Sequence, residues 1–270
     1  MTHSSSSKPK VSVITVNFNM ADSIRGTLDS VLAQDYPHVE SVVIDGASTD
    51  GSREIIASYG SRLGHWVSEP DRNLYDGMNK GVVAATGEWV LFMNSGDRFA
   101  DADALSRLFA AAPQNGTAVL YGHHKRRYAE LGIERLVRAE APKVLPYRMH
   151  CSHQSMAMRR QLLLERPFAL DLLIADYDAI LAAYVAGRRF EAVDCVVAVT
   201  TQGGRSDINR FRALRERAML VRRGRLMTPR VALYYVYLVM RTAAALGLKR
   251  VLPGAIVSSI LRYRPIKGMG

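Results

Sequence analysis

The chain has 270 residues, of which 48% are hydrophobic and 23% charged, and this balance excludes a wholly disordered protein. Its apolar runs are shorter than the ~20 residues that a simple membrane-spanning helix needs. Two cysteines, Cys151 and Cys195, are too few for a disulfide framework and favour a reduced protein in the cytoplasm. Residues 1–10 are rich in serine and predict a disordered arm.

The net charge of +11 is unevenly distributed along the chain. Residues 205–270 hold 15 Lys and Arg against 2 acidic residues, a net charge of +13, so the rest of the chain has a net charge of −2. This asymmetry indicates a nearly neutral core with an appended basic segment that binds a surface. We place a domain boundary near Asp207. It separates a core domain over residues 11–206 from an extension over residues 207–270.

Strands and helices are expected to alternate through the first 120 residues, which predicts an α/β fold with a parallel sheet and right-handed crossovers. Asp22 and Asp50 are the expected N-caps of the first two helices. The expected strands cover residues 11–16, 40–44, 65–68, 89–93, 118–121 and 193–200, and the expected helices cover residues 21–34, 51–59, 75–85, 103–112 and 176–186.

Polar clusters follow three of these strands at the point where each strand ends. They are Asn17, Asp45 and the segment 94–97. Alone, each cluster is better explained by local structure, with Asp45 and Gly46 forming a turn, Asp50 a helix cap and residues 94–97 a turn. Ligands of open parallel sheets bind beyond the carboxyl ends of the strands, and all three clusters are expected on that one rim. Together they therefore predict a binding site.

Asp97 follows a hydrophobic strand in a tight, glycine-containing loop. A carboxylate held in this way suits a hard divalent cation, because Mg²⁺ characteristically takes one or two carboxylates together with phosphate oxygens. Such an ion would neutralise a leaving diphosphate.

Taken in order and at these spacings, six motifs resemble glycosyltransferase family 2. The resemblance is strong over residues 11–100, fainter to about residue 205 and absent beyond it. It implies a GT-A fold, which is a Rossmann-like, mostly parallel sheet flanked by helices. The motifs are residues 13–17 (VITVN), 43–51 (VIDGASTDG), 68–71 (SEPD), 75–81 (YDGMNKG), 87–89 (GEW) and 91–97 (LFMNSGD).

The resemblance implies an inverting glycosyltransferase that takes a sugar from a nucleotide-diphosphate donor, usually a UDP-sugar. The form of residues 75–81 is similar to bacterial enzymes of exopolysaccharide and glycolipid assembly, so the implied acceptor is a lipid-linked or cell-surface glycan. The sequence does not identify the sugar, the linkage or the oligomeric state.

The resemblance also assigns roles on the donor side. Asp97 takes the place of the last aspartate of the family's metal-binding Asp-x-Asp motif, whereas Ser95 stands at its first position. With one carboxylate, an ion of Mn²⁺ or Mg²⁺ is expected to bind chiefly together with the donor diphosphate. The donor-binding residues implied are Thr15 and Asn17 at the base and ribose, Asp45 at the base, Asp71 and Asn79 in the pocket, and Asn94, Ser95 and Asp97 in the last loop.

Asp176 is our choice for the base that removes the acceptor proton, with Asp178 as the second choice. They lie in residues 175–178 (ADYD), which resemble the family segment that supplies this base. The alternative is that both acids only favour the positive end of the helix that they open.

His153 and Gln154 are expected to face the donor phosphates or the acceptor, as a His-Gln pair does in similar enzymes, although His153 is equally well explained as a structural histidine. Arg205, in a loop that resembles the one closing the family's active sites, is expected to offset diphosphate charge, with a solvated arginine as the alternative.

The basic extension alternates arginines with apolar segments over residues 231–240 and 251–261. This pattern favours helices that lie in the interface of an anionic leaflet, and hence a cytoplasmic protein held peripherally at the inner face of the membrane. The alternatives are a helical subdomain packed on the core and a homodimer interface. Nucleic-acid binding is not expected, because the aromatic residues do not interleave with the arginines.

Two other functions remain open from the residues alone. A nucleotidyltransferase on a similar sheet would require a glycine-rich, lysine-containing phosphate loop after the first strand, and the sequence of residues 17–20 does not match such a loop. A non-catalytic adaptor that binds membrane or nucleic acid is favoured only by Ser95.

Overall fold

The computed structural model describes residues 8–111, 113–128, 131–201 and 209–251, with side chains as far as residue 244. Most of the expected N-terminal arm lies outside these residues. So do Arg205, the loop around it and nearly all of the second apolar segment of the extension.

Nine strands of the described residues form one sheet in the order β3-β2-β1-β4-β8-β6-β9-β5, with β7 paired to β6. Strands β3, β2, β1 and β4 are parallel to one another, and β6 is parallel to β9. The strands are β1 Val11–Asn17, β2 Val39–Asp45, β3 His65–Ser68, β4 Trp89–Phe92, β5 Arg98–Phe99, β6 Thr117–Tyr128, β7 Ile133–Val137, β8 Met156–Arg159 and β9 Arg189–Thr201.

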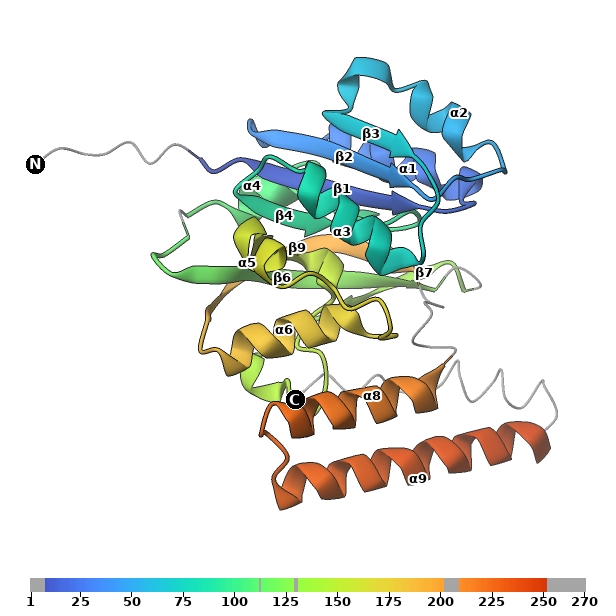
Figure 1. The fold of residues 1–270 in the computed structure, drawn as a ribbon, viewed down its shortest axis with the longest axis vertical. Coiled ribbons are helices and arrows are strands. Elements are labelled where there is room, and N and C mark those ends of the chain that lie inside the picture. Colours follow the sequence, from blue (N-terminus) through green and yellow to red (C-terminus); the bar gives the residue numbers. More distant parts are fainter. Residues whose placement is uncertain (1–7, 112, 129–130, 202–208, 252–270) are drawn as a thin grey trace, which may run out of the picture.

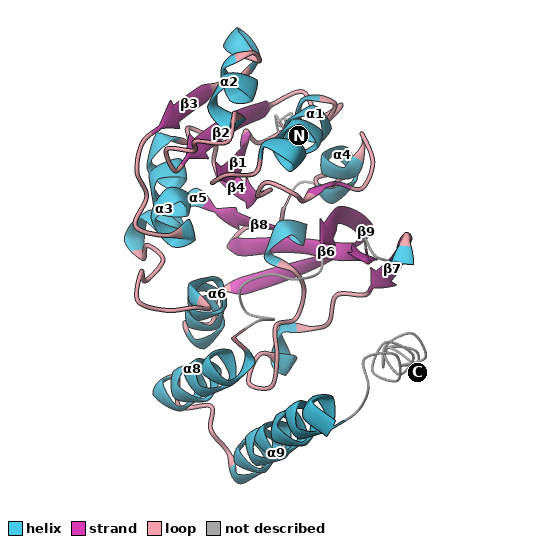
Figure 2. Cartoon of the chain, turned by 90° about the vertical axis from the view of Figure 1, so that its right-hand side faces the viewer, coloured by secondary structure: helices cyan, strands magenta, loops and turns pink. Residues whose placement is uncertain are grey.

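Helices cover both faces of the sheet, as Figures 1 and 2 show. Alternate residues of β1 explain this, because Val11 and Val13 pack into a core cluster with α4, whereas Ile14 and Val16 pack into a second cluster with α3 and α6. The helices are α1 Ala21–Leu32, α2 Ser52–Ala57, α3 Leu74–Ala84, α4 Ala104–Leu108, α5 Arg160–Glu165, α6 Ala175–Val185, α8 Arg210–Arg223 and α9 Pro229–Val251, with short 3₁₀ turns η1 Gly60–Arg62, η3 Pro142–Val144 and η4 His153–Ser155.

The predicted Asp22 cap is wrong, since Met20 occupies the N-cap position and no side chain caps it. The first amide of α1, on Ala21, instead donates to Asp50 Oδ2 at 2.8 Å, and Ser52 N donates to Asp50 Oδ1 at 3.0 Å. Asp50 therefore serves the first turns of both α1 and α2, although it stands one position before the N-cap Gly51.

Several predicted elements have different lengths, among them α4, β6 and β9, which begins at Arg189 instead of residue 193, and three strands were not predicted. Helix α4 ends at Leu108, because Phe109 leaves helical geometry and packs its ring edge-on against Trp89. Strand β6 extends to Tyr128 along β7 and β9. Strand β8 was missed because its sequence, MAMR, contains no β-branched or aromatic residue. Strands β5 and β7 are short edge elements.

Helix α3 lies unusually close to β1, because glycine faces the strand at two positions. A Cβ atom at Gly77 would lie 2.7 Å from Val16 Cγ1, and one at Gly81 would overlap Ile14 Cγ2. This approach fixes the start of α3 beside the carboxyl end of β1.

The first part of the basic extension packs on the core. Helix α8 buries Ala213, Leu220 and Val221 in the cluster that also contains α6. Tyr235 on α9 donates to the carbonyl of Pro146 at 3.1 Å. Among the described helices, none combines the length and the apolar character needed to cross a membrane.

The close approach of α3 to β1 predicts the effect of substituting Gly81. We expect Gly81→Ala to lower the free energy of unfolding by about 1–3 kcal/mol, because the added methyl group overpacks against Ile14. Gly26→Ala is the matched control on α1, since its Cβ would meet open space, and we expect a gain of about 0.5–1 kcal/mol. Urea unfolding measures both, and equal effects of the two substitutions would contradict the packing argument.

Candidate functional site

The polar side chains that end β1, β2 and the segment after β4 are joined by direct hydrogen bonds. Asn17 Nδ2 donates to Asp45 Oδ1 at 2.7 Å, and Ser95 Oγ donates to Asn17 Oδ1 at 2.7 Å. Asn17 is 1% exposed and Asp45 is fully buried. The three strand ends therefore meet at one rim of the sheet, as the parallel arrangement predicts.

The carboxylate of Asp45 accepts four hydrogen bonds from within the chain. Oδ1 accepts from Asn17 and from Ser48 Oγ at 2.5 Å, and Oδ2 accepts from Ser48 N at 3.0 Å and Ser68 Oγ at 2.6 Å. Burial raises the pKa of Asp45, but these bonds outweigh it and hold the pKa below its usual value. Asp45 is therefore ionised, and its hydrogen bonds hold the neighbouring side chains of the site in place. A nucleobase that binds to it would have to share or replace its serine partners.

Two side-chain oxygens at this rim are buried without a hydrogen-bond partner in the described part of the chain. They are Thr15 Oγ1 and Asn94 Oδ1. The other end of the Asn94 amide, Nδ2, lies 3.4 Å from His153 Nε2. Thr15 is fully buried, so its hydroxyl lies beneath the rim and not on its surface. A protonated His153 would donate from Nε2, and exchange of the two ends of the Asn94 amide would then supply Oδ1 as the acceptor.

Asp97 is held from two sides. Its Oδ2 accepts from Gln154 Nε2 at 2.6 Å, and its Oδ1 accepts from Thr201 N, at the end of β9, at 3.2 Å. Burial raises the pKa of Asp97, and the bond from Gln154 only partly offsets it. A cation or a cationic group beside this carboxylate would favour its charged form.

The described residues contain no cluster of three or more His, Cys, Asp or Glu side chains that could hold a metal ion by themselves. Asp97 supplies carboxylate oxygens, which are ligands that Mg²⁺ and Mn²⁺ accept. The site therefore fits an ion whose remaining ligands come from water and from donor phosphates.

His153, in the turn η4, connects this rim to α6. Its Nδ1 lies 3.1 Å from Asp176 Oδ2, and Tyr75 on α3 donates its hydroxyl to Asp176 Oδ1 at 2.9 Å. Burial lowers the pKa of His153, but Asp176 and Asp97 outweigh it and raise the pKa above its usual value. Burial raises the pKa of Asp176, but His153 and Tyr75 outweigh it and lower the pKa. The contact therefore favours an imidazolium paired with a carboxylate over the two neutral groups.

Asp178 makes a different contact, because its Oδ2 lies 2.7 Å from an Nη atom of Arg166. Two helical positions separate it from Asp176, which is a rotation of about 200° around the helix axis. Only Asp176 of the two acids contacts the His153 turn in the described residues.

The polar groups of Asp71 and Asn79 are engaged by other residues of the chain. Asp71 Oδ1 forms an ion pair with Lys80 at 2.7 Å. Asn79 donates to the carbonyl of Phe168 and accepts from its amide, both at 2.9 Å. In this structure Asn79 therefore anchors the segment before α6, and its contact with a donor stays a prediction. Arg205 lies outside the described residues.

No role was predicted for Tyr75, Ser48 or Ser68, although each lies within a motif that carries the family resemblance. Ser48 bonds to Asp45 only three positions before it, whereas the partners of Ser68 and Tyr75 are far away in the chain. Tyr75 and Asp176 are separated by 101 positions, and no local pattern indicates such a contact.

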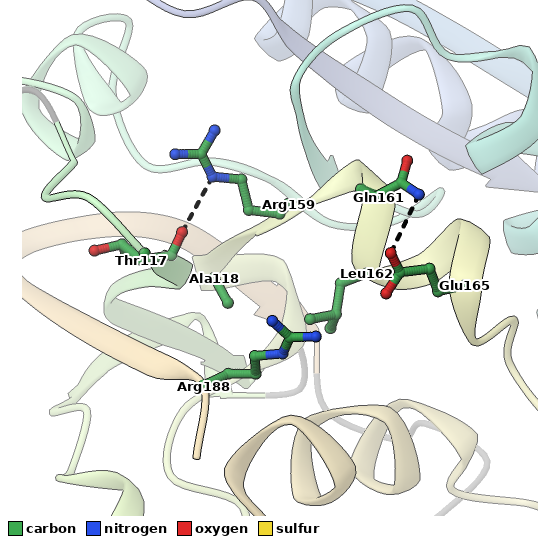
Figure 3. Close-up of a pocket in the computed structure, with 8 residues that line it drawn as sticks. Thr117, Ala118, Arg159, Gln161, Leu162, Glu165 and Arg188 are labelled. Carbon is green, nitrogen blue, oxygen red and sulfur yellow. Dashed lines mark hydrogen bonds between the residues drawn. The ribbon is translucent and has the colours of Figure 1, made fainter. Parts of the chain in front are cut away.

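A separate cavity of about 320 Å³ lies at the opposite end of the sheet, near the first residues of β6 and the last residue of β8. Figure 3 shows Arg188 directed toward it beside Leu162, while Arg159 Nε donates to the carbonyl of Thr117 at 3.1 Å. Because Thr201, at the other end of β9, contacts Asp97, this cavity lies away from the candidate site.

The family model of glycosyl transferase family 2 matches residues 12–168 of the chain. A PGL/p-HBAD biosynthesis glycosyltransferase of Mycobacterium bovis is 36% identical over 105 residues, which is 38% of this chain and 41% of that protein. The chain spans about half the length, or less, of the curated relatives it matches.

Two solved structures share the fold. The S. aureus TarS 1–349 complex with UDP-GlcNAc aligns with a TM-score of 0.62 and 21% identity, over 78% of this chain and 66% of that one. The mannosyltransferase PcManGT of Pyrobaculum calidifontis, in complex with GDP-Man and Mn²⁺, aligns with a TM-score of 0.61 and 21% identity, over 96% of this chain and 82% of that one. The match of the family model over more than half of the chain, on a sheet of this topology, shows that the chain belongs to glycosyl transferase family 2 and has the GT-A fold.

Proposed function

We propose that the protein is an inverting glycosyltransferase, which moves a sugar from a nucleotide-diphosphate donor to a lipid-linked or cell-surface glycan. The observation that carries the proposal is the position of the His153–Gln154 turn. Gln154 bonds to Asp97 on the donor side, and the adjacent His153 pairs with Asp176 on the acceptor side. One turn thus holds a diphosphate-facing carboxylate and a base at opposite ends of a single site.

Asp176 would act as the general base. The lowered pKa of Asp176 favours the charged carboxylate that a base needs, and the Tyr177 backbone amide adds to the effect of His153 and Tyr75. A carboxylate has about four acceptor positions, so lone pairs remain beside these contacts for the hydroxyl of an acceptor. As that proton moves to Asp176, the acceptor oxygen forms a bond to the anomeric carbon. The bond from that carbon to the diphosphate breaks on the opposite side, and the nucleoside diphosphate leaves with the electron pair. In-line displacement inverts the anomeric centre.

On the donor side, Asp97 would hold a divalent ion, Mn²⁺ or Mg²⁺. When bound, the ion would supply positive charge against the diphosphate. A protonated His153 would add charge of the same sign, and its Nε2 lies 3.4 Å from the side-chain amide of Asn94. A UDP-sugar is our proposed donor. TarS was solved in complex with UDP-GlcNAc, and PcManGT was solved in complex with GDP-Man and Mn²⁺.

A thermal-shift screen of UDP, GDP and dTDP, with and without Mn²⁺ or Mg²⁺, tests the donor. We expect UDP to raise the melting temperature most, because a UDP-sugar is the proposed donor. A nucleotide at a hundredfold excess over its Kd stabilises the folded state by about 2.7 kcal/mol. Asp97→Ala should remove the part of this shift that depends on the metal. Asp22→Ala, which changes an exposed carboxylate on α1, is the control and should keep it. If no nucleotide stabilises the protein, the proposed function is wrong.

Substitution of the two acids of α6 tests the base. With the nucleotide sugar that the screen selects, we expect Asp176→Asn to lower kcat by about 10²–10⁴, the usual contribution of a general base. Asp178→Asn should keep kcat within a fewfold and lower the free energy of unfolding by about 1 kcal/mol, because Arg166 loses its partner. The reverse pattern would identify Asp178 as the base.

The outward face of α9 supports a membrane-bound acceptor. Its exposed apolar side chains follow helical spacing at Leu233, Val236 and Met240, which are 70%, 54% and 66% exposed. Arg230 stands at one end of this stripe and Arg241 at the other. Apolar residues flanked by cations suit the headgroup region of an anionic leaflet, where each nearby basic residue contributes about 1 kcal/mol.

Flotation with vesicles tests this face. We expect the full chain to float with vesicles that contain phosphatidylserine, to stay behind with neutral vesicles, and to be released by high salt. The triple variant Leu233→Ser, Val236→Ser, Met240→Ser should lose flotation, whereas Val83→Ser, at a 69% exposed valine of α3, should keep it. If the triple variant floats normally but changes from dimer to monomer in solution, α9 is a homodimer interface instead.

A further inference from the structure

We propose that Tyr75 is a positioning residue for the base, so that the first turn of α3 orients the carboxylate of Asp176 toward the acceptor. The proposal rests on the proposed function, since it requires Asp176 to be the base. It also gives a second role to the motif of residues 75–81, in which only Asn79 was expected to have a role, in donor binding.

The contact itself is short and protected from water. Tyr75 is 8% exposed, and its hydroxyl lies 2.9 Å from Asp176 Oδ1 and 3.1 Å from the carbonyl of Leu173. The neighbouring carboxylate and burial both raise the pKa of Tyr75, so the hydroxyl keeps its proton and donates. Water competes poorly for such a bond, which makes it stronger than an exposed one.

Asp176 is held at both of its oxygens, from two different elements. Tyr75 reaches Oδ1 from α3, and His153 reaches Oδ2 from η4. A carboxylate with one donor can still swing about its Cβ–Cγ bond, whereas two donors on opposite oxygens fix its plane. A fixed plane directs the free lone pairs at one position, which is what proton removal in an in-line reaction requires.

The same stretch of α3 also fixes the backbone that leads into α6. Asn73, the N-cap of α3, donates from Nδ2 to the carbonyl of Leu170 at 2.8 Å. Asn79 bonds to both backbone groups of Phe168, and the ring of Phe168 lies 5.7 Å from that of Tyr75. Tyr75 therefore contacts Asp176 from a rigid support, because these contacts join segment 168–174 to α3.

Few other charged groups face Asp176 in the described residues. His153 contacts it directly from η4, and Asp97 lies behind His153. On its own helix, Asp178 is neutralised by Arg166. If removal of the Tyr75 hydroxyl changes the titration of Asp176, the change therefore reports the lost hydrogen bond and not the effect of another charged group.

The test compares Tyr75→Phe with Tyr177→Phe. Tyr177 is the matched control because it is also buried and donates at 2.6 Å, but to the carbonyl of Leu145 and not to Asp176. The first measurement is the carboxyl titration of Asp176 by ¹³C NMR of aspartate-labelled protein, with Asp176→Asn giving the assignment. Since the bond favours the charged carboxylate, we expect Tyr75→Phe to raise the midpoint by about 0.5–1 pH unit and Tyr177→Phe to leave it unchanged.

The second measurement is turnover of the nucleotide sugar that the thermal-shift screen selects. We expect Tyr75→Phe to lower kcat about tenfold, to leave the donor KM within twofold, and to move the acid limb of the pH profile upward, because the base is protonated at higher pH. A Tyr75→Phe enzyme with unchanged midpoint, kcat and acid limb overturns the inference while Asp176→Asn can still confirm the base. If Asp176→Asn retains full kcat, the base assignment fails and Tyr75 has no base to position.

Discussion

The amide of Asn17 is the interaction on which the site depends. It donates to Asp45 at the end of β2 and accepts from Ser95 in the loop after β4, so a single buried side chain links three neighbouring segments of the sheet. An amide can do this because it carries a donor and an acceptor at fixed geometry. Without it, the buried Asp45 would lose one of its four hydrogen bonds and the Ser95 hydroxyl would lose its acceptor, which is costly. The rim is therefore organised before any ligand arrives.

A second layer of contacts connects this rim to the helices that cover the sheet. The His153–Gln154 turn reaches Asp97 with one side chain and Asp176 with the next, and Tyr75 reaches Asp176 from α3. Along this path the histidine lies between two acids, Asp97 and Asp176. Each group stabilises the charged form of its neighbour, which explains why the pKa of His153 is raised and that of Asp176 is lowered although burial favours the opposite.

Much of the fold was predictable from hydrophobic patterning. The strands of the parallel half of the sheet were predicted because β-branched runs such as residues 11–16 end at polar turns. The antiparallel strand β8 was not predicted, because its residues have no β preference and it becomes a strand only between β4 and β6. Asp50 shows a similar limit. Its position predicts one cap, whereas the structure gives it two first turns to serve.

By itself, the sequence determined the alternation of strands and helices, the polar residues at the carboxyl ends of β1, β2 and β4, and the choice of Asp176 as a candidate, because these features depend on local pattern or on motifs at fixed spacing. Only the tertiary structure decided that Asp178 pairs with Arg166, that Asn79 anchors Phe168, and that Tyr75 meets Asp176. The reason is physical. Which donor reaches a carboxylate depends on helix rotation and on packing between elements about 100 positions apart, and one-dimensional spacing carries no record of either.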